Sequence, residues 1–384
     1  MNVRRAATVA SKEWREMVRD RMFVLLAFLL PVLWMLVFGY GLVLDVDEIP
    51  VVVVDRDHSS LSRDYTYRFI TSRYFNFKGS LADETESDRW LESGKARAVI
   101  VIPEKFEERL LAGQPVAVQT LIDGTFPLRT DITKGYIIVI NGAFSAELLQ
   151  RYVARTRGVS REQANRMARP VNLEVRYLYN EEVRSSWSTI PALVMFSLML
   201  APPLLTALGI VREKESGSIY NIYSSTVSKV EYLAGKLAPY VFVSFINAVV
   251  LWLLATLWFG VPFKGSVGLF LMSALLFVLT STGIGLLVSI MVGTQIAALI
   301  VTMVISILPT ILLSGMIVPV SSLNPGAWIQ AHFFPSMYFT NIVRGTFLKG
   351  VGLDVLWPDL LALALYAVAL RLVAYRLFSK RPRS

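Results

Sequence analysis

The sequence predicts an α-helical integral membrane protein with six transmembrane helices, an N-terminal amphipathic helix and an inserted α/β domain. Only 17% of its 384 residues are charged, 54% are hydrophobic, and the mean hydropathy is +0.52. A soluble domain averages about 25% charged residues. The longest stretch without Asp, Glu, Lys or Arg covers residues 265–343. Because about 20 apolar residues cross a bilayer core as a helix, several such charge-free stretches indicate a multi-pass membrane protein.

Residues 1–21 form the predicted amphipathic helix. Its apolar positions recur every three to four residues and are Val3, Ala7, Ala10, Trp14 and Met17. Cations occupy the rest of the surface, so we expect a cytoplasmic helix with its apolar face in the headgroup region and its cations towards anionic lipid. A frayed basic tail is the alternative. The apolar run that follows is too long for the core of a secretory signal, so residues 22–44 are expected to be a retained first span.

Residues 45–186 differ from the rest because they are rich in charge and alternate strand-like with helix-like segments. Short apolar runs bounded by turn residues predict strands, and longer segments with N-cap signals or proline at the start predict helices. The predicted strands are 50–54, 98–102, 116–122 and 173–179, and the predicted helices are 59–74, 103–111 and 132–157. Together they predict a compact extracytoplasmic α/β domain between the first and second spans.

The remaining charge-free stretches predict five more spans, at residues 187–211, 237–259, 267–292, 295–318 and 355–375. Their short flanks carry unequal numbers of Lys and Arg: residues 1–21 hold six, 212–236 hold four and 371–384 hold five, whereas 260–266 hold one. With six spans, the three basic flanks lie on one side, which the positive-inside rule assigns to the cytoplasm. Both termini, including the 379–384 tail after the 187–378 span region, are therefore expected in the cytoplasm.

Residues 315–345 are apolar but rich in Gly and Pro. Irregular backbone at membrane depth requires protein or a water-filled cavity to satisfy its polar groups. We therefore expect an outer re-entrant segment in place of an ordinary loop.

The chain lacks the residues that catalysis or ion coupling would need. The Gly235-Lys236 pair is followed by leucine and lacks the first glycine of a phosphate-binding loop. There is no cysteine, and the two histidines share no metal-ligand spacing. No cofactor, metal or catalytic residue is predicted, and the net charge of +9 is explained by cytoplasmic cations without nucleic acid. Uphill transport would need energy from another protein.

Residues 212–221, REKESGSIYN, join the second and third spans on the predicted cytoplasmic side. The charged residues extend the second helix beyond the lipid, and Gly217 supplies a backbone break. Ile219 and Tyr220 begin an apolar-aromatic face on a short helix within residues 212–226. Such a helix fits a groove on a partner; an interfacial turn with tyrosines among the headgroups is the alternative.

Residues 212–218, followed by Val230-Glu-Tyr-Leu-Ala-Gly-Lys-Leu-Ala-Pro-Tyr240, resemble the coupling-helix signature of type-two ABC transporter permeases. Residues 313–319, 335–339 and 344–350 are similar to the motifs at the end of that family's fifth span and outer re-entrant segment. The span order and the large domain after the first span resemble the exporter branch. Ser225-Thr226 stands where the family often has Thr-Pro, so the end of the coupling helix is left open.

The resemblance implies a permease without its own ATPase site, paired with an identical or similar permease and with separate cytoplasmic ATPase subunits that hold ATP and Mg. It places Glu213, Glu215, Gly217, Ile219 and Tyr220 on the surface that couples to the ATPase. It implies an exporter of hydrophobic or amphipathic cargo, such as a drug or lipid, in a bacterial plasma (inner) membrane. A periplasmic adaptor is a further candidate partner. The alternative is a membrane-anchored receptor or scaffold that binds through residues 45–186 and transports nothing.

Overall fold

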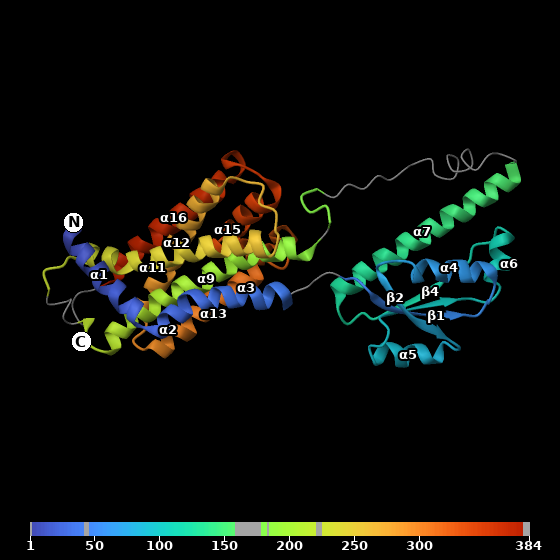
Figure 1. Cartoon of the computed structure of the whole chain (residues 1–384), viewed down its shortest axis with the longest axis horizontal. Coiled ribbons are helices and arrows are strands. Elements are labelled where there is room, and N and C mark those ends of the chain that lie inside the picture. The colour runs from blue at the N-terminus through green and yellow to red at the C-terminus, as the bar shows by residue number, and fades with distance from the viewer. Residues whose placement is uncertain (1, 42–45, 158–177, 183, 220–224, 379–384) are drawn as a thin grey trace. The chain divides into compact units, whose positions relative to one another are not determined.

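The computed structural model describes residues 2–41, 46–157, 178–182, 184–219 and 225–378 (Figure 1). The chain divides into two compact units. One comprises Met1–Leu44 with Tyr177–Ser384, and the other comprises Asp45–Arg176. The first is a bundle of long helices and the second is a small sheet covered by helices.

The helical unit begins with α1 (Val3–Arg19), α2 (Arg21–Val24), a π-helical turn (Leu25–Leu29) and α3 (Leu30–Gly41). After the inserted unit come α9 (Ser185–Glu215), α11 (Lys229–Leu253) with a π-helical turn (Leu254–Trp258), α12 (Val267–Met291) and α13 (Gln295–Leu313). A 3₁₀ turn (Val320–Ser322), α14 (Pro325–Ala331), α15 (Pro335–Arg344), a π-helical turn (Gly345–Lys349) and α16 (Leu353–Leu377) complete it.

Seven helical segments of the described chain are long and apolar enough to cross a membrane, and six of them coincide with the predicted spans. This confirms the predicted fold class of a multi-span helical protein with an inserted α/β unit. The seventh segment, Arg129–Ala154, belongs to α7 (Pro127–Arg157) of the inserted unit. It qualifies by length and composition, while its Ile137 and Phe144 are buried in the core beside the sheet.

The helix α9 is the central helix of the bundle. Its apolar stretch is 89% buried, whereas that of α12, the next most enclosed, is 61% buried. It packs against α3, α11, α12, α13 and α15. The contact with α12 is close, because a Cβ atom at Gly285 would lie 2.2 Å from the carbonyl oxygen of Pro203. A displacement of α9 would therefore disturb most of the bundle.

The described part of the inserted unit contains one four-stranded sheet of order β2-β1-β3-β4, in which only the β3–β4 pair is antiparallel. The strands are β1 (Ile49–Asp55), β2 (Phe75–Leu81), β3 (Ala98–Ile102) and β4 (Gln119–Ile122). The helices α4 (Ser60–Ile70), α6 (Phe106–Leu111) and α7 contribute to the core on one face, and α5 (Thr85–Glu92) contributes to the core on the other. β1 and β3 are buried on both faces, as their unbroken apolar sequences predict.

Most of the predicted elements of the inserted unit are confirmed, with bounds that differ by a few residues: the predicted strand at 116–122 shortens to β4, and the predicted helix at 132–157 begins earlier, as α7. The strands at 50–54 and 98–102 are β1 and β3, and the helices at 59–74 and 103–111 shrink to α4 and α6. β2 and α5 were not predicted. The predicted strand at 173–179 lies almost entirely outside the described residues. Within 315–345 the structure has two short helices, α14 and α15, and α15 buries Phe339 and Ile342 in the bundle core.

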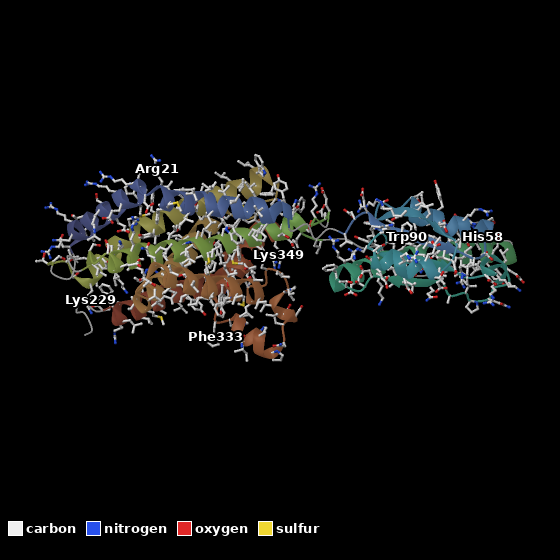
Figure 2. All side chains as sticks on the ribbon, turned by 90° about the horizontal axis from the view of Figure 1, so that it is seen from below. Arg21, His58, Trp90, Lys229, Phe333 and Lys349 are labelled. Atoms are coloured by element: carbon white, nitrogen blue, oxygen red, sulfur yellow. The ribbon has the colours of Figure 1, made fainter. Side chains whose placement is uncertain are left out.

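Both α1 and the C-terminal end of α16 lie at the same end of the bundle, where α11 begins (Figure 1). The side chain of Lys229 donates a hydrogen bond of 2.7 Å to the carbonyl of Phe378, and Asn2 N donates one of 2.6 Å to Glu231. Figure 2 shows Lys229 near this end and Lys349 towards the opposite one. An even number of spans in this unit would likewise bring its first and last helices to the same end.

Candidate coupling site at the end of α9

Four consecutive charged residues end α9, and each is attached to a different neighbour. Arg212 pairs with Asp20, which lies between α1 and α2. Lys214 donates hydrogen bonds to the carbonyls of Ser289, Ile290 (3.3 Å) and Val292 (3.5 Å). These carbonyls belong to the C-terminal end of α12, where a cation complements the helix dipole. Arg212 and Lys214 thus connect α9 to two other segments.

Glu215 connects α9 to α13. Its Oε2 accepts a hydrogen bond of 2.6 Å from the side-chain amide of Gln295, the first residue of α13. A carboxylate at a helix N-terminus is favoured by the helix dipole and by the free N–H groups there. This contact is exposed, so it adds little to the stability of the bundle and mainly orients the start of α13 relative to the end of α9.

Glu213 points into the protein. It is only 6% exposed. Its Oε1 accepts a hydrogen bond of 2.9 Å from Lys12 of α1, and its Oε2 accepts one of 3.0 Å from Tyr232 of α11. Lys236 Nζ, also on α11, lies 3.2 Å from the same Oε2. One carboxylate therefore holds α1, α9 and α11 together.

Glu13 of α1 completes this arrangement. Its two oxygens accept hydrogen bonds from Lys236 Nζ and from the Tyr240 hydroxyl. We call Lys12, Glu13, Glu213 and Lys236, with Tyr232 and Tyr240, the buried ionic cluster. Lys236 and Glu13 have side chains that are 1% and 4% exposed.

The buried ionic cluster is electrically balanced, because two lysines face two glutamates. Burial raises the pKa of Glu13, and the charge and hydrogen bond of Lys236 oppose that rise. Burial lowers the pKa of Lys12, but Glu213 outweighs it, so this pKa lies above its usual value. Removing one partner of a buried ion pair leaves an uncompensated charge and is strongly destabilising. The cluster therefore fixes one arrangement of three helices.

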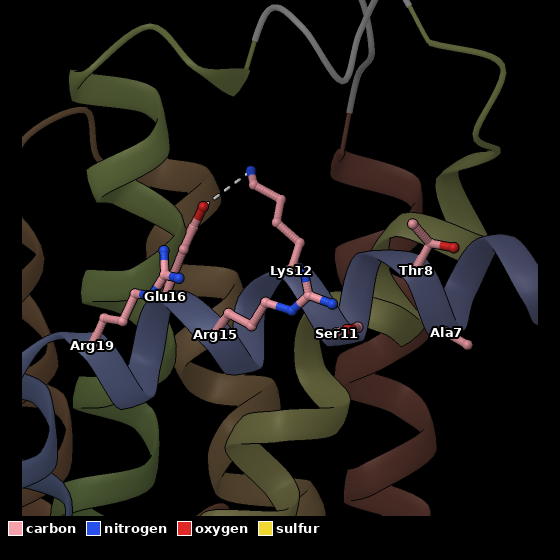
Figure 3. Close-up of a pocket in the computed structure, with 7 residues that line it drawn as sticks. All are labelled: Ala7, Thr8, Ser11, Lys12, Arg15, Glu16 and Arg19. Atoms are coloured by element: carbon pink, nitrogen blue, oxygen red, sulfur yellow. Dashed lines mark ion pairs between the residues drawn. The ribbon is translucent and has the colours of Figure 1, made fainter.

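The distances within the cluster indicate a salt-bridge network and not a metal site. Oxygens of Glu13, Glu16 and Glu213 lie within 4.8 Å of one another. However, Lys12 bridges two of these carboxylates, at 3.6 Å from Glu16 and 2.9 Å from Glu213, and Lys236 holds Glu13. Figure 3 shows the Lys12–Glu16 pair on α1, with Arg15 and Arg19 on the same helix. Cations already occupy the positions that a metal ion would take.

Two glycines allow the helices to approach closely enough to form the cluster. A Cβ atom at Gly235 of α11 would lie 2.5 Å from the carbonyl oxygen of Ala6 in α1. A Cβ atom at Gly209 of α9 would lie 1.6 Å from the Tyr240 hydroxyl, which reaches Glu13. Both positions therefore require glycine for steric reasons.

The predicted lipid face of α1 is only partly correct. Val3, Ala7 and Trp14 are exposed, but Met17 is buried against the bundle. The packed side of α1 also contains Glu13, which pairs with Lys236 of α11, and Val9, which lies against Gly235 of α11. α1 is therefore a structural part of the bundle as well as a surface helix.

Of the five residues predicted for coupling, the structure describes four, and Tyr220 lies outside the described residues. Gly217 has φ +74°, a left-handed conformation that side chains disfavour, and its N–H bonds to the Lys214 carbonyl. Ile219 is 3% exposed. Glu213 and Ile219 thus contact this chain, while Glu215 and the neighbouring Ser216 are exposed.

Sequence reasoning missed Glu13 and Lys236, the most buried ion pair of the described chain. Glu13 lies at i+4 from Val9 and i−4 from Met17, so an acid on the packed stripe of an amphipathic helix was the available signal. Its partner is 223 residues away, so no local pattern could identify it.

The comparisons with known proteins agree with this architecture. The model of the "ABC-2 family transporter protein" family matches residues 21–376. The probable multidrug ABC transporter permease YbhS of Escherichia coli K12 is 29% identical over 349 residues, covering 90% of this chain and 89% of the relative. YbhR from the same organism is 25% identical over 91% of each chain. The inner membrane transport permease YhhJ is 24% identical over 80% of this chain and 79% of the relative.

The family match covers nearly the whole chain, including all six predicted spans and the inserted unit. This confirms the resemblance that the 212–240 and 313–350 motifs indicated. Permeases of this family lack an ATPase domain, so ATP hydrolysis belongs to another subunit. The chain is a multi-pass membrane protein that belongs to the ABC-2 family of transporter permeases.

Proposed function

We propose that this chain is the membrane subunit of an ATP-driven exporter and that the charged end of α9 transmits force from the ATPase to the bundle. The observation that carries the proposal is the attachment of residues 212–215 to α1, α11, α12 and α13 and to Asp20. A push at this end is shared among the helices at once, because ion pairs and hydrogen bonds join them. α9 then carries the displacement through the bundle core.

In this proposal, the exposed residues and the buried residues have different roles. Glu215 and Tyr220 contact the ATPase subunit, while Gly217 sets the direction in which the chain leaves α9. Glu213 and Ile219 are positioning residues, since they are buried within this chain. ATP and Mg bind only to the partner.

We propose a hydrophobic or amphipathic cargo, such as a drug or lipid, moved out of the cytoplasm of a bacterium across the inner membrane. The multidrug designation of the relatives YbhS and YbhR supports this cargo class, and the scarcity of charges in the predicted spans is compatible with it. Two permease subunits, either two copies or a copy with a similar chain, would form the pathway. The inserted unit would lie outside, where it could meet a periplasmic adaptor.

Purification from the native membrane tests the proposal. We expect an ATP-binding subunit to co-purify and its ATP hydrolysis to depend on the permease. The matched comparison is Gly217→Pro against Gly217→Asn, since asparagine tolerates the left-handed conformation and proline cannot adopt it. Proline should abolish substrate-stimulated hydrolysis, whereas asparagine should largely retain it. A complex without any ATPase would instead favour the anchored receptor, and equal activity in both variants would contradict the role of Gly217.

A further inference from the structure

A cavity of about 480 Å³ lies between α11, α12 and α16, and no residue of the buried ionic cluster lines it. Apolar side chains supply nearly all of its wall, including Leu237 of α11 and Leu286 of α12. Among the described residues that line it, the one charged side chain is Arg371 of α16. An apolar chamber with a single cation has the chemistry to bind an amphiphile with a negative head.

Arg371 has no carboxylate partner among the described residues. Its Nη1 donates a hydrogen bond of 2.8 Å to the Ala367 carbonyl, one turn earlier in the same helix. The sequences of residues 220–224 and 379–384, which lie outside the described residues, contain no Asp or Glu. Ionisable side chains within membrane helices are expensive and are retained mainly for function. The Arg371 guanidinium lies beside an apolar cavity and has no carboxylate partner among the described residues. We therefore expect it to bind an anion that is not part of this chain.

The cavity opens towards the lipid. Val230, Val368 and Leu372 line it and are 45%, 58% and 59% exposed. They belong to helices long and apolar enough to cross the membrane, so their exposed faces meet acyl chains. An occupant can enter sideways from the bilayer, and a water-soluble anion would have to cross this apolar rim.

The depth of Arg371 matches a headgroup. It lies six residues before the end of α16 at Leu377, which corresponds to about 9 Å along the helix axis. Tyr375, another lining residue, lies next to Lys229, whose Nζ is 6.0 Å from the ring centroid. The cations at this end would attract a phosphate and repel the ammonium group of a zwitterionic lipid.

We infer that this cavity binds an anionic phospholipid from the leaflet at the α1 end of the bundle, with its phosphate on Arg371 and an acyl chain along α11 and α12. The site differs from the coupling site and needs neither ATP nor transported cargo. Its failure would therefore leave the proposed function unaffected.

Native mass spectrometry of the full chain in detergent tests the inference, with equimolar phosphatidylglycerol and phosphatidylethanolamine added. For the first bound lipid we expect about a tenfold preference for phosphatidylglycerol, which corresponds to about 1.4 kcal/mol. Hydrogen bonds to a charged group contribute at least this much. Arg371→Gln should reduce the preference to near unity. Arg376→Gln, an exposed cation of the same helix end that does not line the cavity, should retain it.

A second variant keeps the test decisive if Arg371→Gln does not fold. Ala238→Phe fills the cavity wall and leaves the cation intact, so it should reduce adducts of both lipids. The inference is overturned if the parent chain shows no preference, if Arg376→Gln loses it as fully as Arg371→Gln does, or if Ala238→Phe binds phosphatidylglycerol as the parent chain does.

Discussion

Lys236→Met should destabilise the helical unit more than the loss of any exposed cation. The side chain of Lys236 is 1% exposed and pairs with Glu13 and Glu213, which are 4% and 7% exposed. After the substitution, Glu213 still pairs with Lys12, but Glu13 keeps only the Tyr240 hydroxyl. An uncompensated buried carboxylate remains, for which we expect a cost of about 3–5 kcal/mol.

The matched control is Lys12→Met. Lys12 belongs to the same cluster, but its side chain is 48% exposed, and Glu213 retains Lys236 when Lys12 is removed. The expected cost is about 1 kcal/mol or less. The double variant Glu13→Gln, Lys236→Met contains no unpaired charge, so it should recover about 2 kcal/mol relative to Lys236→Met alone.

The assay is the free energy of unfolding by SDS titration in mixed micelles, followed by tryptophan fluorescence. A cost for Lys236→Met no larger than that for Lys12→Met would refute the reasoning, because burial would then not determine the energy. The reasoning would also be refuted if the cost of the double variant equalled the sum of the costs of Glu13→Gln and Lys236→Met, since the carboxylate and the lysine would then be independent.

Three further predictions concern the coupling site and the inserted unit. Gly217→Pro should abolish transport while membrane insertion is unchanged, because proline fixes φ near −65° where the chain has +74°; normal efflux would count against it. Gly235→Leu should displace α1, so that a cysteine introduced at Val9 reacts faster with maleimide; unchanged reactivity would disprove the close contact. Hydrogen bonds from Thr125 and the pairing with Arg97 lower the pKa of Asp123 from 3.8 to about 2. Its stabilisation of β4 is therefore present above about pH 4 and is lost as the pH falls towards 2. Asp123→Asn should flatten this acid dependence, measured as the rate of pepsin digestion of the full chain at each pH. An identical pH dependence in the variant and the parent chain would contradict the prediction.

Much of the fold followed from local patterns. Charge-free runs located the six spans, and the unbroken apolar sequences of β1 and β3 predicted central strands buried on both faces. β2 was missed because Gly79 interrupts the alternation of Phe75 and Phe77 with polar residues, and the strand can contain this glycine and a lysine because it lies at the edge of the sheet.

The candidate site was only half predictable. The charges of residues 212–215 and the break at Gly217 are visible in the sequence, since they interrupt a long apolar helix. Their partners are not visible. The Lys236–Glu13 pair joins positions 223 residues apart, and Glu213 points into the bundle towards the same lysine. Long-range electrostatics of this kind is decided by packing, which no local pattern records.

The central claim is that the end of α9 faces the cytoplasm and receives force there. Because the chain has no cysteine, Ser216→Cys provides a single exposed thiol next to Gly217. Labelling with a membrane-impermeant maleimide is the most direct test. We expect reaction in inverted membrane vesicles, slower reaction once the ATPase subunit is bound, and none in intact spheroplasts. Rapid labelling of intact spheroplasts would place this end outside and contradict the account.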